Sequence, residues 1–383
     1  MGADGQDAMS PRSVHDLELV ARASDIAEVV NGVTTLMGPS ALLHVVDREL
    51  KYLVPLDTTT DSVRLDGEFR AAILASRSHV EDGRRWIALP ERNEPVFVVS
   101  VEASDGDRSE VEPDVSALGA LLGGHRHRFE DLERLRRRRE MTVAAELQWD
   151  ISPVRADSLG AFDVAGVLEP AYEVAGDLFD FASSDGFVWA YSFDGMGHGT
   201  DATISGALAL AAVRNVRREG GTLVEQMRTA NTVLFDQYAG DRFVTAAACR
   251  LDDDGSVHIV NAGHEPIRIW RSGVVERLGL DVDLPLGVQS DATYNVQSIT
   301  PLSLGDGLVL VSDGSASQQV GGDGATFGGD RLDQALSDRW STVPLQTGHD
   351  VVNDVLRLTD VGRPDDDITV VIVRRRDDGE EIR

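Results

Sequence analysis

The chain has 383 residues, of which 42% are hydrophobic, and 36 Lys+Arg stand against 65 Asp+Glu, a formal net charge of -29 at pH 7. Because this length exceeds the usual single domain, we expect two domains and a connector. A surface this acidic repels nucleic acid phosphates and anionic lipids, which excludes nonspecific binding to nucleic acid or to a membrane.

The chain also lacks the signals of export and of membrane insertion. No apolar run approaches the roughly 18 to 20 residues that span a bilayer, and the longest candidate, residues 202–213, is interrupted by Gly206. The N-terminus has neither a basic region nor an apolar stretch of the kind that directs secretion. The one cysteine, Cys249, cannot form an internal disulfide and lies in an apolar run typical of core. We therefore expect a cytoplasmic protein.

The first 113 residues predict a short tail and a small α/β domain. Residues 1–13 are rich in Gly, Asp and Ser, and we expect them to be disordered. Apolar spacing from Val14 to Met37 predicts a helix that is interrupted or capped near Ser24 and Asp25. Further strands are predicted at residues 41–46, 51–56, 86–89 and 95–101.

A long helical segment is predicted next, from Asp114 to about Asp150. Apolar and ring-bearing side chains recur in it at spacings of three and four, which is the pattern of a coiled-coil seam: Leu118, Leu122, His125, Phe129, Leu132 and Leu135. Its Arg-rich face is typical of a solvated helix surface, although it could also bind an acidic partner. Residues 114–152 are therefore predicted to form a helical, coiled-coil linker.

From Phe162 onward the pattern changes to alternating strands with a few long helices. The predicted strands span residues 163–168, 187–193, 243–250, 257–261, 267–271, 307–312 and 368–374. The predicted helices span residues 201–218, 223–238, 331–340 and 349–359. Since strict βαβ alternation is absent, we predict a layered α+β domain over residues 153–376, followed by a tail at 377–383.

Four segments of this domain place aspartates beside an apolar run, three of them next to glycine: Val174–Asp180, Ser192–Gly199, Val309–Gly314 and Asp365–Val371. One such aspartate is most often part of a turn, but four in one domain favour a cluster at the rim of a sheet. Clustered carboxylates repel one another unless a cation lies among them, and oxygen ligands favour Mg²⁺ or Mn²⁺ over zinc. Two such ions could activate a water and bind phosphoryl oxygens, and they would supply the positive charge that the acidic surface lacks.

These segments, in this order, resemble the PPM-type serine/threonine phosphatases of the SpoIIE/RsbU-like branch. The resemblance covers about residues 140–376. It also includes the segments Ala145–Gln148, Phe243–Thr245, Asn261–Pro266, Pro285–Gly287 and Leu304–Asp306. It implies a β-sandwich flanked by helices, with two Mn²⁺ or Mg²⁺ ions at one rim.

The resemblance also implies a role for each acidic motif. Asp194 would bridge both metal ions, and Gly195 would offer its backbone carbonyl. Asp313 and Asp366 would bind the first ion. Asp177 would serve the second ion, either directly or through water. Metal-dependent hydrolysis of phosphoserine or phosphothreonine is the activity that follows, with Asp194 at its centre.

Several assignments stay open at this stage. The family pattern favours Asp366 over the adjacent Asp367, but a shift by one residue is possible. His198 could protonate the leaving serine or threonine oxygen, or it could merely order its loop. His264 is interpreted as a turn histidine that satisfies backbone groups, and Thr245 as part of strand packing.

The resemblance finally suggests a substrate and a mode of control. Relatives dephosphorylate a STAS-domain antagonist of an anti-sigma factor, and residues 14–113 loosely resemble a GAF sensor domain. The linker would dimerise the protein and bias the placement of Asp177. Two alternatives remain: a catalytically silent pseudophosphatase that acts as a binding module, and an unrelated acidic metal-binding regulator.

Overall fold

A computed structural model describes residues 11–57, 60–91, 93–103, 115–126, 128–137, 141–169, 176–320, 325–358 and 364–377. The chain divides into two compact units, Met1–Glu140 and Met141–Arg383, and each is described by itself. The predicted disorder of residues 1–13 falls mostly outside the described residues, and helix α1 already begins at Pro11. Most of the predicted tail, residues 378–383, lies outside them as well.

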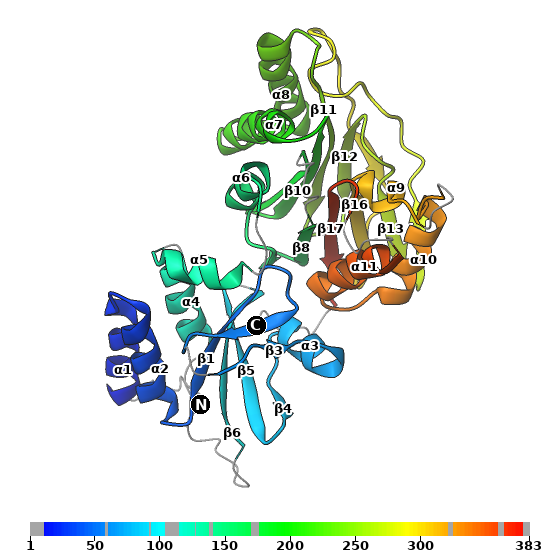
Figure 1. Ribbon diagram of the computed structural model, residues 1–383. Coiled ribbons are helices and arrows are strands. Elements are labelled where there is room, and N and C mark those ends of the chain that lie inside the picture. The colour runs from blue at the N-terminus through cyan, green and yellow to red at the C-terminus, as the bar shows by residue number, and fades with distance from the viewer. Residues whose placement is uncertain are drawn as a thin grey trace, which may run out of the picture. The chain divides into compact units, whose positions relative to one another are not determined.

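The first unit is built on an antiparallel sheet with the strand order β3-β2-β1-β6-β5-β4 (Figure 1). Its strands are β1 (Leu42–Val46), β2 (Tyr52–Pro55), β3 (Val63–Arg64), β4 (His79–Glu81), β5 (Arg84–Glu91) and β6 (Glu94–Glu102). Its helices are α1 (Pro11–Arg22), α2 (Ile26–Met37), α3 (Gly67–Leu74), α4 (Val115–Arg126) and α5 (Glu130–Arg136). Asp25 caps α2 by accepting a hydrogen bond from the Glu28 amide at 2.9 Å, so the predicted interruption near Ser24 and Asp25 is confirmed.

The prediction of one continuous helix from Asp114 to Asp150 is wrong. Helices α4 and α5 are separate and belong to the first unit, and α6 (Val143–Ile151) is the first helix of the second unit. Leu118, Leu122 and Leu132 are fully buried in the core that α1, α2 and the sheet share. The three-and-four spacing was therefore that of an ordinary core-facing helix. A homodimer stays a prediction, but these leucines could not form its seam without leaving that core.

The second unit is a sandwich of two antiparallel sheets, as predicted. One sheet has the order β15-β12-β11-β10-β9 and the other β14-β13-β16-β17-β8-β7. The first contains β9 (Leu178–Ser184), β10 (Phe187–Gly195), β11 (Val244–Asp252), β12 (Val257–Ala262) and β15 (Gln297–Ile299). The second contains β7 (Ala156–Leu159), β8 (Phe162–Glu169), β13 (Arg268–Arg271), β14 (Val274–Arg277), β16 (Gly307–Val311) and β17 (Ile368–Arg375).

Helices cover the outer faces of this sandwich (Figure 1). They are α7 (Thr200–Arg218), α8 (Leu223–Tyr238), α9 (Gly314–Ser317), α10 (Gly329–Arg339) and α11 (Pro344–Leu358). Along β10, Tyr191 and Phe193 pack against α7 and α8, whereas Val188 and Ala190 enter the core between the sheets. This alternation follows from the period of two in a strand, and it turns Ser192 and Asp194 toward the second sheet.

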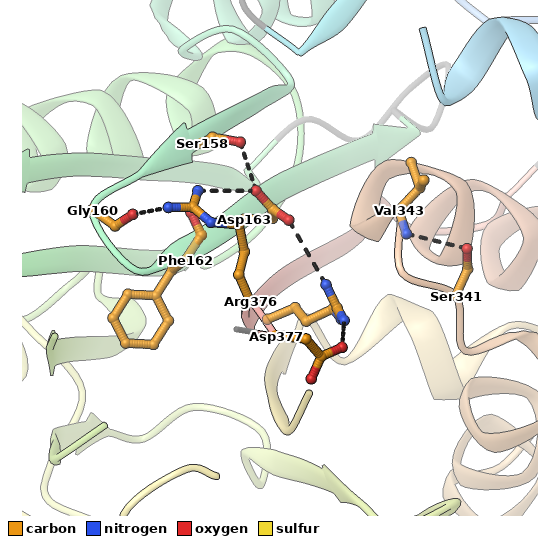
Figure 2. A network of polar contacts seen from close by, with 9 residues as sticks. Ser158, Gly160, Phe162, Asp163, Ser341, Val343, Arg376 and Asp377 are labelled. Carbon is orange, nitrogen blue, oxygen red and sulfur yellow. Dashed lines mark hydrogen bonds and ion pairs between the residues drawn. The ribbon is translucent and has the colours of Figure 1, made fainter. Parts of the chain in front are cut away.

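A polar network fastens the C-terminal end of β17 to the β7–β8 hairpin (Figure 2). Asp163 accepts a hydrogen bond from the Ser158 hydroxyl at 2.6 Å and an ion-paired hydrogen bond from Arg376 at 3.4 Å. The Arg376 guanidinium also donates to the Gly160 carbonyl, and Arg374 pairs with Asp377 at 2.6 Å. These contacts join the C-terminal end of β17 to the β7–β8 hairpin, at the opposite end of the strand from Asp366.

Two sequence predictions about the core and the membrane can be compared with these elements. Cys249 is fully buried in β11, as predicted. Within the part of the chain that is described, no helix combines the length and the apolarity that crossing a bilayer requires.

Candidate active site

Asp194 is the penultimate residue of β10, at the edge of the first sheet. It lies directly opposite Thr245 of β11, and the next pair, Gly195 and Val244, ends the ladder. Burial, followed by the nearby charges of Asp313, Asp366, Asp367 and Glu265, raises the pKa of Asp194 to about 7. All of these causes act in the same direction, so the site is short of positive charge.

Asp177 precedes β9, the strand beside β10, and only 3% of its surface is exposed. Burial and then the charges of Asp194 and Asp367 raise its pKa well above the usual value, while hydrogen bonds from Ser312 and Thr369 oppose this shift. The Thr369 hydroxyl donates to Asp177 Oδ2 at 2.6 Å. Asp177 therefore lies between the two sheets. The beginning of its motif, Val174 and Ala175, lies outside the described residues.

Asp313 and Asp366 belong to the second sheet. Asp313 comes two residues after β16, and Asp366 comes two residues before its neighbour β17. Burial, and then the charge of Asp313, raises the pKa of Asp366. A Cβ at Gly314 would lie 2.0 Å from the Asp367 carbonyl oxygen, so only glycine lets these two segments approach so closely.

Asp367 has a different role from Asp366. Its side chain is buried, and its Oδ2 accepts hydrogen bonds from Gly176 N at 2.9 Å, Asp177 N at 3.2 Å and Gln148 Nε2 at 2.6 Å. Such a carboxylate positions the Asp177 backbone, whereas half-buried Asp366 keeps contact with solvent. The arrangement supports Asp366 as the metal-ligand candidate.

Replacing each of these two aspartates by alanine separates the two roles. Asp367→Ala removes the acceptor of three buried N–H groups, each worth about 1 to 3 kcal/mol when unsatisfied, and we expect its Tm to fall by at least about 5 °C. Asp366→Ala is expected to keep its Tm within about 2 °C and to lose Mn²⁺ affinity. Thermal melts and Mn²⁺ calorimetry check this. Equal melting losses in both variants, with unchanged Mn²⁺ binding in Asp366→Ala, would refute it.

Gln148 of α6 belongs to a segment of the family pattern, but the sequence analysis assigned it no role. It is fully buried, and its Nε2 donates both to Asp367 Oδ2 and to the Asp177 carbonyl at 2.9 Å. Thr142 begins α6 by capping it, accepting a hydrogen bond from the Ala145 amide at 3.1 Å. The helix that starts the second unit is thus joined directly to the Asp177 segment.

Gly176, two residues before β9, and Gly195, the last residue of β10, bring their backbones into contact. Gly195 N donates to Gly176 O at 3.1 Å, and a Cβ on Gly176 would lie 2.4 Å from the Gly195 carbonyl oxygen. Any side chain at position 176 would therefore displace the segment that carries Asp177 from the end of β10. The Gly195 carbonyl is the backbone group that the family pattern assigns to a metal ion.

The histidines occupy contrasting environments. His198 is exposed on the loop between β10 and α7, three residues after Gly195. His264 is buried, and its ring is hydrogen-bonded with the hydroxyls of Thr245 at 2.8 Å and Ser192 at 3.0 Å. Two interpretations need an addition. The His264 ring is hydrogen-bonded with two side-chain hydroxyls as well as interacting with the Val311 backbone, and Thr245 contributes a hydrogen bond in addition to packing.

The carboxylates gather at one rim without forming a closed cage. Within the described ranges, no three His, Cys, Asp or Glu side chains are placed to hold a metal ion between them. Mg²⁺ is usually bound by one or two carboxylates together with waters and substrate phosphates, so an open rim fits such an ion better than a protein cage would. The charge deficit around Asp194 fits a divalent cation in the same way.

A two-sheet sandwich flanked by helices, with carboxylates at one rim, defines the PPM-type phosphatase fold. The chain belongs to the SpoIIE family, since the model of Stage II sporulation protein E (SpoIIE) matches residues 184–376, half of its length. It is also similar to phosphoserine phosphatase RsbU of Bacillus subtilis (strain 168), with 21% identity over 239 residues, 62% of this chain and 70% of RsbU.

The chain is also similar to solved structures. The chain is similar to the RsbU and RsbW domains of a Mycobacterium tuberculosis protein, with TM-score 0.51 and 21% identity over 58% of this chain and 62% of that one. For the PP2C phosphatase domain and a regulatory fragment of Bacillus subtilis SpoIIE, the TM-score is 0.48, with 21% identity over 56% of this chain and 64% of that one. The chain thus spans less than two thirds of either solved protein. At 21% identity, the likeness to the Mycobacterium tuberculosis protein shows the fold alone.

Proposed function

We propose that this protein is a metal-dependent protein serine/threonine phosphatase. The observation that carries the proposal is the gathering of Asp177, Asp194, Asp313 and Asp366 from two sheets into one rim. Burial, and then the charges of Asp313 and Asp366, raise the pKa of Asp194 there to about 7. The similarity to RsbU, which is named a phosphoserine phosphatase, supports it.

The rim would hold two Mn²⁺ or Mg²⁺ ions. Asp194 is the carboxylate best placed to be shared between them, since the charges of Asp313 and Asp366 reach it from the second sheet and Asp177 couples to it within the first. Bound divalent cations supply activation of water and neutralisation of the phosphoryl oxygens.

Side chains of the protein would position Asp177 and donate the proton to the leaving group. Thr369 and Gln148 hold Asp177 at two points, Thr369 through its carboxylate and Gln148 through its backbone carbonyl. His198, exposed on the loop four residues after Asp194, is the proposed proton donor to the serine or threonine oxygen that leaves. An exposed position suits a group that must meet a protein substrate.

The proposed substrate is a phosphorylated STAS-domain protein that antagonises an anti-sigma factor, in a cytoplasmic setting. Similarity to RsbU motivates this choice. Incubating the protein with phosphorylated STAS-domain candidates and Mn²⁺, read by mass spectrometry, tests it. Loss of 80 Da from one phosphoserine or phosphothreonine of a candidate is expected. Turnover of a generic phosphopeptide, with every such candidate untouched, would refute the substrate class and keep the activity.

Replacement of His198 by asparagine is expected to slow hydrolysis in a way that depends on the leaving group. A serine alkoxide needs a proton to leave, so the rate on a phosphoserine peptide should fall by about 10²-fold. p-Nitrophenolate leaves without one, so hydrolysis of p-nitrophenyl phosphate should fall less than about 10-fold. Initial rates at saturating Mn²⁺ measure both. Equal losses on the two substrates would contradict a proton-donor role and favour loop ordering.

The first unit is proposed to control this activity through α6. That helix starts directly after the boundary between the units, and Gln148 joins it to Asp177. Any shift of α6 would therefore change the position of a proposed metal-binding residue. A signal bound by the first unit would act by shifting α6 and, with it, Asp177.

Removal of residues 1–140 is the corresponding test. A cut at residue 112 would leave α4 behind with Leu118 and Leu122 exposed, so the boundary at 140 is the better choice. We expect the concentration of Mn²⁺ that gives half-maximal activity to change by at least about 3-fold, with a smaller change in the maximal rate. Metal titrations on both proteins check this. Superimposable titration curves would argue against control through the metal site.

A further inference from the structure

His264 bridges two hydroxyl groups inside the sandwich. It follows β12 and is 5% exposed. Its Nδ1 is hydrogen-bonded with Thr245 Oγ1 at 2.8 Å and its Nε2 with Ser192 Oγ at 3.0 Å. Because a hydroxyl can donate or accept, both ring nitrogens are satisfied in either tautomer.

The two hydroxyls belong to the nearest neighbours of Asp194 on its own face of the sheet. Ser192 lies two residues before Asp194 on β10, and Thr245 is the residue directly opposite on β11. The ring is therefore hydrogen-bonded both to β10, which presents Asp194, and to the neighbouring strand β11. A change in the position of the ring would therefore shift the end of β10 that carries Asp194.

The same ring also reaches the second sheet. It interacts with the backbone of Val311, the last residue of β16 and two residues before Asp313. One side chain thus contacts the strand ends that carry Asp194 and Asp313. Burial lowers the pKa of His264 to about 4, so the ring is neutral near pH 7 and adds no charge that would oppose a cation.

The turn that carries His264 is held independently of its ring. Asn261 Oδ1 accepts from the His264 amide at 2.8 Å, and Asn261 Nδ2 donates to the His264 carbonyl at 3.2 Å. Asn261 is itself fixed in β12. Loss of the ring therefore leaves the turn in place, which separates the work of the ring from that of the loop.

We propose that His264 is a positioning residue whose ring sets the spacing between Asp194 and Asp313 across the two sheets, so that both carboxylates can share a divalent cation. This inference rests on the proposed function, because it assumes that the rim binds metal. Residues that orient metal ligands typically change metal affinity by about 10- to 100-fold when replaced.

The test is Mn²⁺ calorimetry on the metal-free, full-length protein, with thermal melts in chelator and steady-state kinetics. His264→Phe removes both hydrogen bonds, and we expect Mn²⁺ affinity to fall at least about 10-fold. His264→Gln can keep one bond and should recover part of the affinity, and it serves if the Phe variant fails to fold. With excess Mn²⁺, kcat should recover in either variant while KM for a phosphopeptide stays within about 2-fold.

His349→Gln is the matched control. His349 is equally buried but lies on α11, and its replacement should lower the Tm without changing Mn²⁺ affinity. The proposal would be overturned if both His264 variants bound Mn²⁺ with wild-type affinity. It would also be overturned if their loss of Mn²⁺ affinity were no larger than that of His349→Gln at the same fall in Tm. Mn²⁺ binding by the wild-type protein without phosphate release would instead refute the proposed function, and the affinity comparison would still decide the role of His264.

Discussion

Replacing Asp194 by asparagine is expected to abolish phosphate release and, in the same protein, to raise the thermal stability of the metal-free form. Losing the carboxylate that we propose is shared by two ions should remove several kcal/mol of transition-state stabilisation, or about 10³-fold in rate or more. Asparagine has nearly the same shape but no charge. It therefore removes both the burial of a charge and the repulsion by neighbouring carboxylates, which together raise the pKa of Asp194.

The sign of the stability effect follows from proton linkage. The pKa of Asp194 is about 7 in the fold and near its ordinary value of 3.8 when unfolded, so the unfolded chain releases its proton first as pH rises. The stability of the wild type falls between about pH 4 and pH 7 and then levels off. At pH 8 we expect Asp194→Asn to be more stable by on the order of 2 kcal/mol, or about 4 to 8 °C in Tm.

Thermal melts in chelator from pH 4 to pH 8 measure this difference. It should vanish near pH 4, and excess Mn²⁺ should raise the Tm of the wild type much more than that of the variant. Asp150→Asn, an exposed change on α6, is the control and should melt like the wild type throughout. If the variant melted below the wild type at pH 8 in chelator, the prediction would be wrong. The Asp194 carboxylate would then stabilise the metal-free fold through contacts within the protein.

Replacing Gln148 by alanine is expected to weaken metal binding without touching a proposed ligand. The side chain joins the Asp177 carbonyl to the Asp367 carboxylate, and its loss removes one of the three donors to that buried oxygen. Asp177 then loses part of its support. We expect Mn²⁺ affinity and the rate at limiting Mn²⁺ to fall by about 10- to 100-fold.

Saturating Mn²⁺ should restore most of that rate, because the ligands themselves remain. Asp150→Ala changes the same helix on its exposed side, so it controls for a general effect on α6. If Gln148→Ala kept the Mn²⁺ titration of the wild type, α6 would not be coupled to the metal site, and control of the enzyme through this helix would lose its physical basis.

Much of the second unit could be predicted because its signals are local. Alternating apolar residues marked β8, β10, β11, β12, β13, β16 and β17. The acidic strand ends could be recognised in the sequence. One aspartate beside glycine at the end of an apolar run is common, but several of them in one domain are unusual. Strands β7, β9, β14 and β15 were missed, since each is short or follows a polar motif.

The contacts that hold the site could not be predicted, because they join distant parts of the chain. Gln148 and Asp367 are 219 positions apart, and Thr369 and Asp177 are 192 apart. The error at the linker has a related cause. A Cβ on Gly119 would lie 2.4 Å from the Pro90 carbonyl oxygen, so α4 packs closely on β5. Leucine spacing alone does not distinguish such a core-facing helix from a short coiled coil.

The most direct test of a metal-dependent phosphatase is one titration of Mn²⁺ into metal-free protein, followed by calorimetry and by phosphate release from a phosphoserine peptide. We predict that phosphate release is absent in chelator, rises with the occupancy of the rim, and fails in Asp194→Asn at every Mn²⁺ concentration. Binding of Mn²⁺ without turnover in the wild type would contradict the account and identify a silent binding module.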